Sequence, residues 1–185
     1  MGKNNQYLDI MHTELPPEAA ALQKKAINQC LQTLLPQTDA LSLIVTGHLY
    51  VEHWLEWLLR ASISRPEKLL GSINLTFAEK LAVAESLGLL RNNLAEATGR
   101  LNKIRNHIVH NLEYQIPQKD LQLLASFAPD LTKKKQLLLN KIGSPKIELV
   151  KFCPYFAGYV VGYVFGRRNA KSYLKAALEN SHAKE

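Results

Sequence analysis

Cysteine is scarce in this chain, and no long run of apolar residues is present. Cys30 and Cys153 are far apart in the sequence, and neither has a histidine at metal-ligand spacing. A disulfide framework and a zinc site are therefore excluded, which favours a reducing, cytoplasmic location. The longest nearly uncharged apolar run, 152–166, is shorter than the ~20 residues that cross a membrane. Residues 1–15 do not read as a signal peptide, so we expect no integral membrane segment.

The motifs of several enzyme classes are also missing. The chain has no glycine-rich phosphate loop, no dinucleotide-binding fingerprint and no nucleophile elbow. Leucine and alanine are abundant, with 32 and 18 of the 185 residues, and both favour helices. The 46% hydrophobic and 21% charged residues are typical of a globular protein. The sequence therefore predicts an all-α fold.

Prolines, glycines and capping residues divide the chain into helices. We expect helices at about 18–35, 39–62, 76–90, 93–112, 118–127, 130–142 and 146–180, the last being one helix or two hinged near Gly166. Thr38 or Asp39 is the expected N-cap of the second helix, and Thr76 with Glu79 forms a capping box for the third. Asn93 is a weaker start signal for the fourth helix. The strongly apolar 39–62 helix should lie at the centre of a bundle.

Positive charge is concentrated in the second half of the chain. Residues 1–99 hold 8 basic and 10 acidic side chains, a net charge of −2, whereas residues 100–185 hold 15 and 6, a net charge of +9. Such a field attracts polyanions, so we expect nucleic acid as a partner, with acidic proteins or lipid headgroups as alternatives. We divide the chain into a helical bundle, 16–117, and a basic helical extension, 118–185.

The most unusual segment is 103–111, which places arginine, amide and imidazole side chains on one amphipathic helix. Arg105 is predicted at the edge of the apolar stripe. Asn102, Asn106 and His110 form a polar line on the side away from the core. Because roughly 140° around the helix separates Arg105 from His110, one copy cannot aim both at a single atom. Two copies related by a two-fold axis could gather both groups in one cleft, which predicts a homodimer.

The Arg105-Asn106-x-x-x-His110 pattern resembles the signature of the HEPN superfamily, an arginine-polar-x-x-x-histidine motif on a late helix. The helix pattern over residues 20–115 resembles small bacterial members related to the mannitol operon repressor. The resemblance implies an HEPN-like bundle of about four to five helices that dimerises through the motif helices. It also implies metal-independent endoribonuclease activity without a cofactor, in toxin–antitoxin, defence or stress-response systems. Non-catalytic members act as regulators or scaffolds that bind a protein or nucleic acid, and this alternative stays open.

The resemblance assigns a role to each motif residue. His110 would act as general acid or base on the ribose 2′-hydroxyl or the leaving oxygen, because imidazole titrates near neutral pH. Arg105 would stabilise charge on the phosphoryl oxygens, and Asn106 would orient the phosphate or the imidazole. Leu112 stands where some toxin-type members have a tyrosine, which argues against control by adenylyl transfer. An antitoxin-like protein is a further candidate partner.

A second polar line precedes the motif. His48, Glu52 and Glu56 repeat every four residues on an otherwise apolar helix. The line lacks the Glu-x-x-His pairs of a carboxylate-bridged metal site, so we expect no metal there. It is either a solvated face or polar support for the motif.

Further candidates for RNA binding lie outside the three motif residues. The side chains that could contact RNA are Asn102, Lys103, Lys133, Lys134, Lys135, Arg167 and Arg168, with Lys171 and Lys175 beside them. Four aromatic residues could stack on bases: Tyr155, Phe156, Tyr159 and Tyr163. We favour packing of this segment against the bundle or its dimer mate, because Gly158, Gly162 and Gly166 permit close helix approach. Base stacking and shallow membrane binding are the alternatives.

Overall fold

The computed structural model describes residues 15–71, 74–111, 113–127 and 143–182, and only the backbone of 168–182. Its elements are α1 (Pro17–Leu34), α2 (Ala40–Ser62), the short π-helical turn η2 (Glu67–Gly71), α3 (Phe77–Ser86), α4 (Asn92–His110), α5 (Gln118–Ala125) and α7 (Lys146–His182). The described residues form no strand, so the predicted all-α class is confirmed. The helix expected at 130–142 lies outside the described residues.

Two of the predicted helix starts are made by the expected side chains. Asp39 accepts a hydrogen bond from the Ser42 N–H at 2.8 Å. The Thr76 hydroxyl accepts from the Glu79 N–H at 3.4 Å, and the Glu79 carboxylate accepts from the Thr76 N–H at 2.8 Å. Both contacts satisfy amide groups that the first turn of a helix leaves without intrahelical partners.

Two other predicted boundaries are wrong. The N-cap of α4 is Arg91, which makes no side-chain capping bond, and Asn93 lies inside the first turn. The third helix ends at Ser86 instead of residue 90. Gly88 takes a positive φ of 63°, and the Leu89 N–H then donates to the Ala84 carbonyl at 2.9 Å. This left-handed glycine satisfies the last carbonyls and stops the helix.

We expect Thr76→Ala to lower the free energy of unfolding by about 1 kcal/mol, because Ala cannot accept the capping bond. Thr33→Ala is the matched control, since the Thr33 hydroxyl donates to the Gln29 carbonyl within α1 and caps nothing. Urea unfolding of both variants measures the difference. Equal losses in the two variants would show that the capping box adds no stability.

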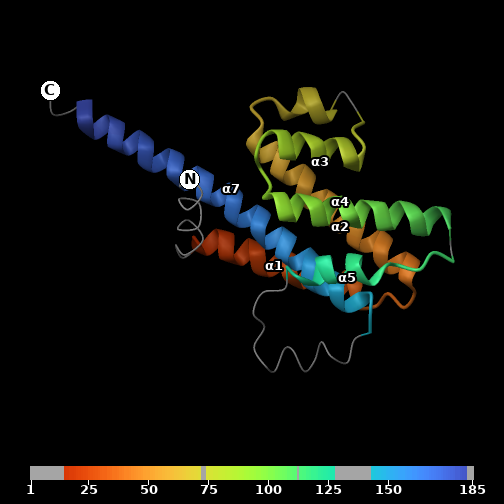
Figure 1. Cartoon of the computed structure of the whole chain (residues 1–185). Coiled ribbons are helices and arrows are strands. Elements are labelled where there is room, and N and C mark those ends of the chain that lie inside the picture. The colour runs from red at the N-terminus through yellow and green to blue at the C-terminus, as the bar shows by residue number, and fades with distance from the viewer. Residues whose placement is uncertain (1–14, 72–73, 112, 128–142, 183–185) are drawn as a thin grey trace, which may run out of the picture.

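Helix α2 lies at the centre of the bundle, as predicted. It contacts α1 and α7 on one side and α3 and α4 on the other. Figure 1 shows α7 running diagonally through the molecule beside α1, with α3 and α4 above it. The carboxyl-terminal end of α7 projects beyond the other helices.

The described helices on the two sides of residue 117 share one core. Buried apolar residues of α7 form one continuous core with those of α1, α2 and α4. A β-carbon at Gly47 would lie 3.2 Å from Leu149, and the Tyr159 hydroxyl donates to the Leu89 carbonyl at 3.1 Å. The apolar faces of α1 and α2 must be buried, and α7 packs against them.

Helix α7 is continuous through Gly166, so the alternative of two hinged helices is wrong. The glycine spacing permits a close approach at Gly158, where a β-carbon would lie 2.7 Å from the Gln23 side-chain nitrogen of α1. Gly162 has no neighbour within 4 Å of such a carbon. The favoured packing of this segment against the bundle is thus confirmed, with Gly158 as the residue that allows it.

By length and composition alone, Lys146–Arg167 is one helix of 22 residues that could cross a membrane. The length of the uncharged run did not predict this candidate span, because the helix continues through charged residues at both ends of that run. However, 61% of its most apolar window is buried inside the bundle. Contacts with α1, α2 and α5 account for its apolar side chains.

Candidate motif site on helix α4

Helix α4 is amphipathic, as its periodicity predicts. Leu101, Ile104 and Ile108 are buried, and they hold the helix against the core. Because α4 packs on α2, α3 and α5, its exposed side is limited to the strip that these helices leave uncovered. The motif lies at the edge of this strip.

The three motif residues sit on the last turns of α4. Arg105 is half-buried at the edge of the apolar stripe, as predicted, whereas Asn106 and His110 are exposed. One guanidinium nitrogen of Arg105, Nη1, donates to the Asn106 side-chain oxygen at 2.9 Å. Another, Nε, is buried and has no hydrogen-bond partner among the described residues. The structure therefore brings Arg105 and Asn106 together and leaves an unsatisfied donor beside them.

Asn102 does not lie on the side away from the core, so its predicted place is wrong. Its side-chain oxygen is 3.0 Å from Nε2 of His48 on α2. Because an amide oxygen can only accept, the imidazole donates. This bond takes up the side-chain oxygen of Asn102, which leaves the exposed Lys103 as the better placed of the two for RNA.

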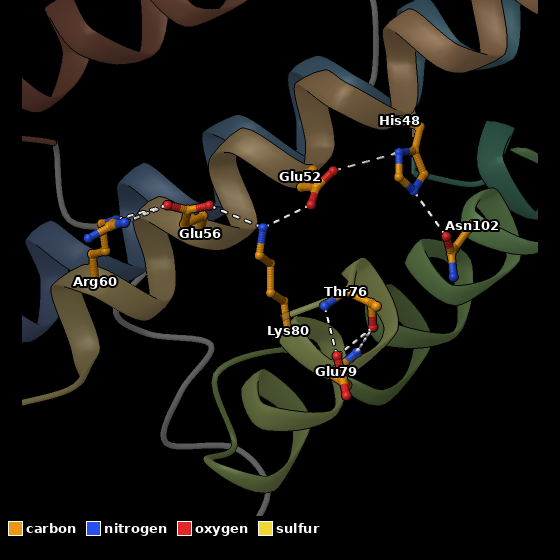
Figure 2. Close-up of polar contacts among 8 residues, drawn as sticks. All are labelled: His48, Glu52, Glu56, Arg60, Thr76, Glu79, Lys80 and Asn102. Carbon is orange, nitrogen blue, oxygen red and sulfur yellow. Dashed lines mark hydrogen bonds and ion pairs between the residues drawn. The ribbon is translucent and has the colours of Figure 1, made fainter. Parts of the chain in front are cut away.

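The polar line of α2 is a network between helices (Figure 2). His48 is 4% exposed, and its Nδ1 lies 4.0 Å from a carboxylate oxygen of Glu52. The Lys80 ammonium, from α3, donates to Glu52 at 2.8 Å and to Glu56 at 3.1 Å. Arg60 pairs with the other oxygen of Glu56 at 2.7 Å. The solvated-face alternative is therefore wrong at His48, whose bond to α4 makes it polar support for the motif helix.

Burial determines the protonation of this network. Burial lowers the pKa of His48; the bond to Asn102 and the charge of Glu52 oppose it, and the charges of Arg105 and Lys80 add to it. Burial also lowers the pKa of Lys80, but its carboxylate partners outweigh burial and the net pKa is raised. Near neutral pH the lysine is thus charged and the imidazole neutral.

The other RNA-contact candidates are scattered. Lys133, Lys134 and Lys135 lie outside the described residues, as does the side chain of Arg168. Arg167 is exposed on α7, and its guanidinium lies 5.6 Å from the ring centre of Tyr163. Figure 1 shows this part of α7 well away from the end of α4.

The aromatic residues of α7 mainly build the core. Phe156 is fully buried and Tyr159 is 8% exposed, so base stacking is wrong for these two. Tyr155 lies 5.4 Å from the ring of Phe127. Tyr163 is half-buried and carries Arg167 over its ring.

One pocket of about 430 Å³ opens at the end of α4 next to the start of α2. It is lined by Asp39, Ala40, Leu41, Ile108, Tyr114, Gln115, Ile116, Leu121, Ser144 and Pro145. The hydrogen bond from Ser42 lowers the pKa of Asp39, so the pocket wall carries a negative charge. The amino-terminal ends of α2 and α7 oppose that charge, and the pocket selects no class of ligand.

Two features near the motif escaped the sequence analysis. Leu49 of α2 is 57% exposed and Val109 of α4 is 41% exposed, although both belong to apolar-rich helices. Cys30 and Cys153, which are distant in sequence, lie side by side in the core, and burial raises the pKa of Cys153. Raised pKa and burial make that thiol unreactive.

No protein family, curated protein or solved structure matches this chain. The likeness to HEPN proteins therefore depends on the motif and the helix pattern. Among the described residues, no three histidine, cysteine, aspartate or glutamate side chains gather to hold a metal ion.

Proposed function

We propose that this protein is an RNA-binding homodimer and a metal-independent endoribonuclease of the HEPN type. The observation that carries the proposal is the buried Nε of Arg105, which has no hydrogen-bond partner in the part of the chain that the structure describes. Buried donors are seldom left unpaired, because each costs desolvation energy. Phosphate oxygens match the donors of a guanidinium in geometry and charge. A phosphate from the RNA backbone would satisfy this donor once the Arg105 side chain turns to expose it.

Exposed apolar residues on the motif helix and its neighbour support a homodimer. Val109 lies one turn after Arg105, and Leu49 lies next to His48 on the neighbouring helix. Both are exposed apolar residues that a second copy would cover. A two-fold axis at this surface brings Arg105 and His110 of both protomers into one cleft, which a single helix cannot do.

The shared cleft supports cleavage without a metal. One His110 removes the proton of the ribose 2′-hydroxyl, and the freed oxygen attacks the adjacent phosphorus. The bond from phosphorus to the 5′ oxygen breaks, and the partner's His110 protonates that oxygen. Arg105 stabilises the negative charge that grows on the phosphoryl oxygens. The products are a 2′,3′-cyclic phosphate and a 5′-hydroxyl end.

We place this activity in the cytoplasm, where RNA is present. Regulation by an antitoxin-like protein, in a toxin–antitoxin, defence or stress-response system, is part of the same proposal. It is supported by the motif alone.

The test uses full-length protein treated with a chelator. Light scattering measures its oligomeric state, and incubation with mixed cellular RNA measures binding and cleavage. We expect a dimer and RNA fragments with cyclic phosphate ends, because the motif needs two copies and no metal. Arg105→Ala should abolish cleavage and weaken RNA binding, whereas Lys103→Ala, which removes an equal charge from an exposed neighbour, should weaken binding only. A monomer that binds no RNA contradicts the proposal. If the protein is a dimer that binds RNA and leaves it intact, it is a non-catalytic regulator instead.

A further inference from the structure

His48 is the buried ionisable side chain that joins the polar network to the motif helix. The centre of its ring lies 4.2 Å from that of Phe77 of α3. The ring also donates to Asn102 of α4 (Figure 2). Asn102 precedes Arg105 by one turn on the same helix. The bond therefore fixes the rotation of α4 against α2 immediately before the motif.

The imidazole of His48 can take up a second proton without losing any of its present contacts. Nε2 already donates to Asn102, and the carboxylate of Glu52 lies 4.0 Å from Nδ1. A proton added at Nδ1 would face that carboxylate. An imidazolium would thus keep its hydrogen bond to Asn102 and have a carboxylate at ion-pair distance from Nδ1, which lowers the cost of charging a buried imidazole.

Two cations oppose this protonation. Lys80 of α3 is held by Glu52 and Glu56, so its charge is already balanced. Arg105 of α4 has no carboxylate partner among the described residues, and its charge lowers the pKa of His48. A phosphate on Arg105 would cancel part of its field. By linkage, RNA binding and protonation of His48 then favour each other.

We propose that His48 is a positioning residue for the motif, holding α4 through Asn102, and that RNA bound at Arg105 draws a proton onto its imidazole. This inference rests on the proposed RNA-binding function. In this proposal His48 acts through Asn102 and does not contact RNA. The coupling predicts that the affinity for RNA rises as the pH falls below neutral. The rise should exceed what protonation of the exposed histidines alone produces.

The first experiment follows the imidazole signals of His48 by NMR across pH, in full-length protein with and without a 2′-O-methyl RNA oligonucleotide. We expect the pKa of His48 to be higher in the complex, because the phosphate offsets the charge of Arg105. The probe resists cleavage because its 2′ oxygen is blocked. RNA that binds and leaves the titration of His48 unchanged overturns the proposal.

The second experiment needs no RNA, so it separates this inference from the proposed function. Arg105→Gln should raise the pKa of His48 in the free protein, because it removes a nearby positive charge. Lys103→Gln removes the same charge from an exposed neighbouring position and should leave that pKa unchanged. Equal effects of the two variants overturn the coupling. If RNA binding fails while Arg105→Gln still raises the pKa of His48, the coupling between Arg105 and His48 stands, and both the endoribonuclease proposal and the RNA-driven uptake of a proton are overturned.

A third variant tests positioning without loss of the fold. Asn102→Asp keeps an acceptor for His48 and adds a negative charge, so the pKa of His48 should rise while α4 stays in place. Asn102→Leu removes the acceptor, and the Arg105 Nε signal should then shift. An Arg105 signal that is identical in both variants and the wild type contradicts a positioning role.

Discussion

Replacement of His110 by Ala is expected to slow RNA cleavage about 10²- to 10⁴-fold, the contribution typical of general acid–base catalysis. The imidazole is exposed at the last residue of α4, so its removal leaves the core intact. Circular dichroism and thermal unfolding should match the wild type. Single-turnover cleavage of a fluorescent RNA measures the loss.

His107→Ala is the matched control for this variant. His107 is also an exposed imidazole on the last turns of α4, but its ring stacks on Tyr114 at 4.9 Å. We therefore place it outside the cleft and expect its removal to change cleavage little. Comparable losses in the two variants would mean that general surface charge, and not His110, supports the reaction.

Mixing two inactive variants tests the shared cleft. A heterodimer of Arg105→Ala and His110→Ala retains one Arg105, on the second chain, and one His110, on the first. We expect cleavage to recover only in part after the two are mixed and allowed to exchange subunits, because the remaining Arg105 and His110 act across the two-fold axis while the second His110 of the mechanism is missing. No recovery, with exchange demonstrated, would place a complete site within one chain.

A chain ending at residue 117 is expected not to fold. It would lack Phe152 and Phe156, which are fully buried against the bundle. Loss of one such phenylalanine side chain typically costs about 3–5 kcal/mol, and a domain has only about 5–15 kcal/mol in total. Circular dichroism should show little helix and no cooperative thermal transition.

The control for this truncation is a chain ending at Arg167. Figure 1 shows that α7 beyond this point projects past the other helices. We expect this shorter protein to unfold cooperatively, at a temperature near that of the full chain. Cooperative unfolding of the fragment ending at 117 would instead show that the first four helices form an independent domain.

Most helix positions could be predicted because helix formation depends on near neighbours. The capping contacts of Asp39 and Thr76 join residues three positions apart, and the amphipathic stripe of α4 repeats within two turns. The prediction failed at Asn93 and at the end of α3. There Arg91, which is not a favoured cap residue, precedes α4, and Gly88, a favoured helix stop, ends α3 before the apolar pattern does.

The sequence by itself determined the helical class, the order of the helices and the residues of the motif, because composition and periodicity act along the chain. Only the tertiary structure decided that α7 belongs to the core, that Asn102 turns toward His48 and that Arg105 keeps an unsatisfied donor. The physical reason is distance along the chain. His48 and Asn102 are 54 residues apart, and only the packing of α4 on α2 brings them within hydrogen-bonding range.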